Sequence, residues 1–108
     1  MLGTPVRVAA GRSVIREDGP GRECFVVVDG EFRVERRDRF LAVVGPGEFV
    51  GEMALLDLQP RTATVTAVRD STVWAFTRRE FATLMYRCPV LAAHVRGVAG
   101  VREGAMAA

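Results

Sequence analysis

The 108-residue sequence contains no lysine, one histidine and only two cysteines. All fifteen basic residues are arginine, a bias that also occurs in chains encoded by GC-rich genomes and does not by itself indicate guanidinium chemistry. The net charge of +2 is too small to indicate a nucleic-acid partner. Cys24 and Cys88 lie far apart and form no CxxC motif, which argues against a disulfide framework or a zinc site. Both are predicted to be core thiols in a reduced, cytoplasmic protein.

Long apolar runs are also missing. No stretch approaches the roughly 18 apolar residues of a membrane span, and the first residues lack the basic and apolar regions of a signal peptide. A length of 108 residues leaves no room for a second folded unit, and 49% hydrophobic with 26% charged residues is a globular composition. We expect one domain over residues 1–108, with no membrane contact.

Short apolar runs alternate with turn residues up to about residue 77, a pattern typical of an antiparallel barrel or sandwich. Asp29-Gly30 separates two apolar runs and favours a type I′ turn, so a β-hairpin is predicted there. Residues 36–39 are predicted to form a solvated charged turn, with a functional patch as the alternative. Later runs at 62–68 and 72–76 have the β-branched and aromatic content of strands. The barrel is therefore placed at about residues 5–77.

The pattern changes to helix at Thr77. Thr77 and Glu80 have the spacing of a capping box, and an apolar face follows. A helix is therefore predicted to begin near Arg78.

A further helix is predicted from Pro89, which suits the first turn because its missing N–H is harmless there. Its apolar stripe comprises Leu91, Val95 and Val98. Gly97 and Gly100 weaken it by roughly 1 kcal/mol each relative to alanine. This helix therefore relies on packing against the barrel, a ligand or another subunit. We place the C-terminal helices at about 78–103 and a tail at 104–108.

The segment from Gly51 to Val65, GEMALLDLQPRTATV, does not read as ordinary strand or helix. A short run of helix-forming residues lies between two strands and returns through Pro60. The exposed N–H groups and dipole of a one-turn helix attract an anion, and the planar fork of Arg61 can grip two phosphate oxygens. Glu52 can accept a hydrogen bond from a sugar hydroxyl. The pattern predicts a site for a phosphate and a ribose together.

Read as a whole, FVGEMALLDLQPRTATVTA at 49–67 closely resembles the phosphate-binding cassette of cyclic nucleotide-binding domains. This family includes bacterial catabolite activator proteins, regulatory subunits of cyclic-nucleotide-dependent kinases and cyclic-nucleotide-gated channels. The Asp29-Gly30 turn, the Gly45-Pro46-Gly47-Glu48-Phe49 approach and the helix start at 77–81 occur in family order, so the resemblance spans roughly residues 5–103. It implies a mainly β fold with C-terminal α: a double-stranded β-helix (jelly-roll) barrel with a short phosphate-binding helix and C-terminal helices.

The resemblance also implies a role for each cassette residue. In the family the glutamate binds the ribose 2′-hydroxyl and the arginine the cyclic phosphate, and these positions match Glu52 and Arg61. Backbone groups of three further residues would line the phosphate and ribose: Gly51, Met53 and Ala54. Thr62 matches a position where some members carry a hydroxyl that reaches the phosphate or a syn guanine, and an ordinary strand threonine is the alternative. The implied ligand is cAMP, or else cGMP, without a metal.

In the family the last helix moves to cover the base. Here that helix would run from Pro89 to about Glu103, with Arg102 placed to reach over the base or the phosphate side. An exposed helix-end arginine is the alternative for Arg102. His94 is expected to be a surface or packing residue, so no catalytic residue and no enzyme activity are expected. The sequence stops before any helix-turn-helix, so direct DNA binding by this chain is not expected.

Two classes of function remain open. One is a cyclic-nucleotide sensor that passes occupancy to a partner or to its own dimer through the last helix; it would be a stand-alone module or the excised sensor domain of a larger transcription factor or effector. The other is an interaction or dimerisation module that keeps the barrel and has lost the ligand. Members of the family without ligand usually lack the glutamate or the arginine, and this sequence keeps both.

Overall fold

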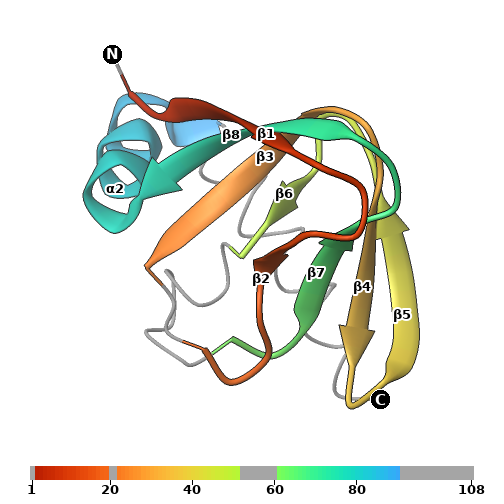
Figure 1. The fold of residues 1–108 in the computed structure, drawn as a ribbon. Helices are drawn as coiled ribbons and strands as arrows, with labels where there is room; N and C mark the ends of the chain where they lie inside the picture. The colour runs from red at the N-terminus through yellow and green to blue at the C-terminus, as the bar shows by residue number, and fades with distance from the viewer. Residues whose placement is uncertain (1, 20–21, 52–60, 91–108) are drawn as a thin grey trace.

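A computed structural model describes residues 2–19, 22–51 and 61–90 (Figure 1). Within these ranges eight strands form two four-stranded antiparallel sheets. Sheet A contains, in spatial order, β1 (Thr4–Val8), β8 (Ser71–Thr77), β3 (Glu23–Asp29) and β6 (Phe49–Val50). Sheet B contains β2 (Ser13–Ile15), β7 (Thr64–Ala67), β4 (Phe32–Arg36) and β5 (Arg39–Val44).

The chain passes from one sheet to the other at most of its connections, and only β4 and β5 are consecutive strands of the same sheet. The orders β1-β8-β3-β6 and β2-β7-β4-β5 describe a jelly-roll barrel. The predicted fold class is confirmed. The short helix predicted in the cassette lies outside the described residues.

The barrel core lies between the two sheets. Side chains alternate along each strand, so one face of every strand contributes to this core. In β7, Val65 and Ala67 are buried, while Thr64 and Thr66 are only partly so. The core is aliphatic with two phenylalanines, and its buried members are Val8, Ile15, Phe25, Val27, Phe32, Val34, Val44, Val50, Ala63, Val65, Ala67, Val73 and Ala75.

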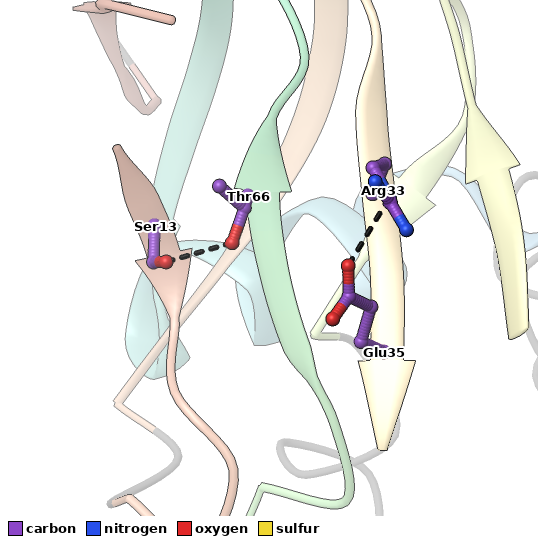
Figure 2. A network of polar contacts seen from close by, with 4 residues as sticks. All are labelled: Ser13, Arg33, Glu35 and Thr66. Carbon is purple, nitrogen blue, oxygen red and sulfur yellow. Dashed lines mark hydrogen bonds and ion pairs between the residues drawn. The ribbon is translucent and has the colours of Figure 1, made fainter. Parts of the chain in front are cut away.

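Figure 2 shows two polar contacts on strands of sheet B. The hydroxyls of Ser13 and Thr66 lie 2.8 Å apart and link β2 to β7. On β4, Arg33 forms an ion pair with Glu35 at 3.1 Å. Arg33 and Thr66 are register partners that are not buried, so these contacts lie on the face of sheet B away from the core.

The predicted hairpin at Asp29-Gly30 is wrong, because β3 belongs to sheet A and β4 to sheet B. Gly30 has φ +103, and a Cβ there would overlap the Ser71 side chain. The Glu31 N–H donates to Ser71 Oγ at 3.1 Å. Glycine is therefore needed because the backbone passes close to β8 where the chain crosses from one sheet to the other.

The true two-residue hairpin lies at the charged turn between β4 and β5. Arg37 and Asp38 both have positive φ, 51° and 61°, and Arg36 pairs with Arg39 across the strand ends. Positive φ at both central residues defines a type I′ turn. The prediction of a charged turn at 36–39 is confirmed.

The helix α2 (Arg78–Arg87) packs on the outer face of sheet A and begins where predicted (Figure 1). Thr77 and Glu80 form the complete capping box. The buried members of a second cluster, between α2 and the sheet, are Cys24, Phe76, Phe81 and Met85. Pro89 and Val90 are again helical, as expected. The predicted stripe at 91–98, His94 and the tail lie outside the described residues.

The two cysteines differ from each other. Cys24 is fully buried, as predicted, but Cys88 is exposed. The prediction of a core thiol at Cys88 is therefore wrong. The reason is that α2 ends at Arg87, so Cys88 is its C-cap and follows the buried stripe that Phe81 and Met85 present to the sheet.

Candidate phosphate-binding site

Gly51 follows β6 directly and has φ +83. A Cβ at this position would overlap Nη1 of Arg61 and lie 2.8 Å from Cδ1 of Ile15. Glycine is therefore required here both by the left-handed backbone and by the closeness of the arginine side chain. The absence of a Cβ at Gly51 therefore leaves room for the Arg61 guanidinium at the start of the predicted cassette.

Arg61 is buried, with 6% of its surface exposed. Its Nη1 donates to the Gly51 carbonyl at 3.0 Å, and its Nη2 donates to the Glu23 carbonyl. A guanidinium removed from water must be hydrogen-bonded, because an unsatisfied buried cation is very costly. The two carbonyls meet this need, and they fix the plane of the fork between β3 and the end of β6.

The backbone of Arg61 is fixed as well. Its N–H donates to the Gly19 carbonyl at 3.0 Å, and its carbonyl accepts the Asp18 N–H at 2.8 Å. Asp18 has a positive φ of 63°, in the left-handed region that aspartate tolerates better than most residues. Arg61 is therefore held at both its main chain and its side chain, which is the preorganisation an anion site needs.

Thr62 lies on the other side of the chain from Arg61. Every second residue from Arg61 through β7 is buried, and Ala63 is one of them. Thr62 lies between Arg61 and Ala63 and is exposed. The structure thus brings Gly51 and Arg61 together and leaves Thr62 outside that contact. Four predicted site residues lie outside the described residues: Glu52, Met53, Ala54 and Arg102.

Two contributors to the site were missed in the sequence. Glu23 contributes its main-chain carbonyl, which accepts a hydrogen bond from Arg61, 38 positions away in the chain. Ile15 contributes its Cδ1, which would lie 2.8 Å from a Cβ at position 51. A carbonyl acceptor leaves no residue-type signal because every residue has one. Only the pairing of β3 with its neighbours reveals it.

Other kinds of site find no support in the described part of the chain. Across residues 2–19, 22–51 and 61–90, no three His, Cys, Asp or Glu side chains are grouped so that they could hold a metal ion. The helices in those ranges include none that is long and apolar enough to cross a membrane.

Comparisons with known proteins show the family to which this chain belongs. The cyclic nucleotide-binding domain family matches residues 5–88. A cyclic AMP receptor protein from Thermus thermophilus is 34% identical over 87 residues, covering 76% of this chain and 40% of that protein. A cGMP-dependent protein kinase from Drosophila melanogaster is 35% identical over 83 residues, covering 77% of this chain and 8% of the kinase.

The fold is similar to that of a solved relative. The crystal structure of the Thermus thermophilus catabolite activator protein superposes with a TM-score of 0.85 and 30% identity, covering 93% of this chain and 49% of that chain. This chain belongs to the cyclic nucleotide-binding domain family and is a regulatory binding domain of that type. It spans less than half the length of the relatives named here.

Proposed function

We propose that this chain is a sensor whose ligand is cAMP, bound through its cyclic phosphate at Arg61. The observation that carries the proposal is the buried guanidinium of Arg61, fixed between the carbonyls of Gly51 and Glu23. A fixed arginine fork in a buried position suits a phosphate monoanion, because charge-assisted bidentate bonds are strongest where water is excluded.

The roles of the other ligand-binding residues are proposed from the resemblance to the phosphate-binding cassette. Glu52 accepts the ribose 2′-hydroxyl, and backbone groups of Gly51, Met53 and Ala54 line the phosphate and ribose. Arg102, on the last helix, reaches over the base or the phosphate side. Binding alone is proposed, with no catalysis and no metal.

cAMP and cGMP remain to be distinguished by experiment. One relative is named for cyclic AMP and another for cGMP, so the resemblance alone does not separate the two purines. Thr62 is the residue on which a guanine preference would depend.

Occupancy is proposed to pass through the C-terminal helix that begins at Pro89, either to a partner or to a second copy of the chain. Direct DNA binding and membrane contact are not part of the proposal. The cytoplasmic location and the boundaries of a single domain over 1–108 stay predictions.

Calorimetric titration with cAMP and cGMP tests the proposal. Arg61→Lys keeps the charge but loses the fork, so we expect at least a tenfold loss of affinity, or about 1.4 kcal/mol. Glu52→Gln should weaken binding less. The matched control is Arg33→Lys on the outer face of sheet B, which should bind as the wild type does. A folded wild type that gives no heat with either nucleotide would instead favour the assembly module.

A further inference from the structure

The four residues that follow β2 form a tight turn, the 16–19 turn, which holds the main chain of Arg61. The Gly19 N–H donates to the Arg16 carbonyl at 3.0 Å and closes the turn. The Asp18 N–H donates to the Arg61 carbonyl at 2.8 Å, and the Gly19 carbonyl accepts the Arg61 N–H at 3.0 Å. Because both bonds come from one turn, the position of the Arg61 main chain depends on the conformation of that turn.

The 16–19 turn is held in its conformation by contacts of Glu17. Asp18 has a φ of 63°, in the left-handed region that is unfavourable for a residue with a Cβ and persists where the surroundings fix it. The Glu17 N–H donates to Thr64 Oγ1 at 3.0 Å, and Glu17 Oε2 accepts the Arg37 N–H at 2.8 Å. Glu17 thus attaches the turn through its main chain to β7 and through its side chain to the β4–β5 turn.

The β4–β5 turn is a firm anchor for this carboxylate. Arg37 is the first central residue of the type I′ turn, which the pairing of Arg36 with Arg39 closes. The strand that leads into the turn, β4, is paired on both edges, with β5 and with β7. Figure 1 shows the chain after β2 and the β4–β5 turn at the same end of the barrel. The N–H that Glu17 accepts is therefore fixed by the ladder of sheet B.

We propose that Glu17 is a positioning residue for ligand binding. By tying the 16–19 turn to the β4–β5 turn, it fixes the main chain of Arg61, and so places the guanidinium for an anion that Glu17 itself does not contact. The inference rests on the proposed function, since it needs an anion at Arg61.

The direction of the effect follows from preorganisation. In the wild type the Arg61 main chain is ordered before the ligand arrives, so binding does not include the cost of ordering it. Without the Glu17 carboxylate, the 16–19 turn can leave its left-handed conformation, and the two bonds to the Arg61 main chain loosen with it. Binding then includes the entropic cost of ordering the turn, so affinity falls. Because the bond between Glu17 and Arg37 is exposed to solvent, the expected loss is modest, about 3- to 5-fold.

Calorimetric titration with cAMP and cGMP should compare Glu17→Ala with Asp70→Ala. Asp70 is a matched control, because its carboxylate also accepts an exposed backbone N–H from a distant residue, that of Ala10 at 2.9 Å, before the start of β2 and not after its end. Affinity should fall about 3- to 5-fold in Glu17→Ala and stay unchanged in Asp70→Ala. Glu17→Gln keeps an oxygen that can accept the Arg37 N–H, so it should bind as the wild type does.

Two further measurements separate positioning from a general loss of stability. By NMR, the amides of Asp18 and Arg61 should exchange with solvent faster in Glu17→Ala than in the wild type, and at the wild-type rate in Asp70→Ala. In a double-mutant cycle, Glu17→Ala should add little to the loss of affinity caused by Arg61→Lys, since its effect passes through the arginine fork.

The outcomes distinguish this inference from the proposed function. Equal affinity of Glu17→Ala and the wild type, or an equal loss in Asp70→Ala, overturns the role of Glu17 and leaves the sensor proposal intact. The same holds for amides that do not respond, for a Glu17→Gln variant that binds as weakly as Glu17→Ala, and for fully additive losses in the cycle. A wild type that binds neither nucleotide overturns both proposals.

A second variant keeps the test open if Glu17→Ala does not fold. Thr64→Val removes the hydroxyl that accepts the Glu17 N–H and keeps the β-branched shape that suits a strand. It should weaken binding in the same direction, and unchanged affinity would refute the role of the 16–19 turn.

Discussion

Substituting Gly51 by alanine should displace Arg61 and so weaken both the fold and ligand binding. The added Cβ would overlap Arg61 Nη1, which must move and give up its 3.0 Å bond to the Gly51 carbonyl. Loss of a hydrogen bond from a charged donor costs about 1.5–3 kcal/mol. The left-handed φ of +83 adds about 1–2 kcal/mol for any residue with a Cβ. Urea unfolding should therefore show a loss of about 2.5–5 kcal/mol.

Gly47 provides a matched control. It has nearly the same φ, +88, but a Cβ there would meet nothing within 4 Å. Gly47→Ala should lose only the backbone contribution of about 1–2 kcal/mol and keep the affinity of the wild type. Gly51→Ala should lose about 10- to 100-fold in affinity for the cyclic nucleotide, or 1.4–2.8 kcal/mol. Equal stability and equal affinity of the two variants would refute the account of Gly51 as the residue that makes room for the guanidinium.

Three further results are expected. The stability advantage of the wild type over Glu80→Gln should be full near neutral pH and shrink as pH falls below about 5, because hydrogen bonds from the Thr77 and Gly3 backbones lower the folded-state pKa of the Glu80 carboxyl, and their contribution is lost on protonation. Gly30→Ala should cost about 3 kcal/mol in urea unfolding, because its Cβ would overlap Ser71 and its φ is +103. A maleimide should label Cys88 in the native protein and Cys24 only after unfolding, as read by mass spectrometry.

Each of these results has a contrary outcome, and Gly30→Ala also has a matched control. A pH-independent difference between the wild type and Glu80→Gln would mean that the carboxylate does not hold the two backbone N–H groups. Gly11 also has a positive φ with open space around it, so Gly11→Ala separates backbone strain from the clash at Gly30; equal losses would contradict the close approach. Labelling of both cysteines at the same rate in the native state would contradict the burial of Cys24.

The sequence predicted the parts of this fold that depend on local chemistry. The capping box at Thr77 and Glu80 is decided within four residues, and the strand at 72–76 follows from its β-branched and aromatic content. Sheet membership was not predictable in this way. Asp29-Gly30 has the composition of a hairpin turn, but its glycine serves a crossing between sheets, while the type I′ turn uses Arg37 and Asp38.

The same distinction between local sequence patterns and long-range contacts applies to the candidate site. Gly51 and Arg61 were predicted from the cassette pattern, and the structure brings them together. The Glu23 carbonyl was not predicted, because main-chain acceptors carry no signature in the sequence. The contacts of Leu2 with Trp74 and of Gly3 with Glu80 were missed for a related reason, because they join residues more than 70 positions apart.

A crystal structure of this chain with cAMP tests the central claim most directly. The account predicts cyclic phosphate oxygens within about 2.7–3.2 Å of the Arg61 guanidinium nitrogens, the distance of an N–H···O hydrogen bond. A nucleotide whose phosphate lies elsewhere, with the Arg61 guanidinium making no contact to it, would contradict the account.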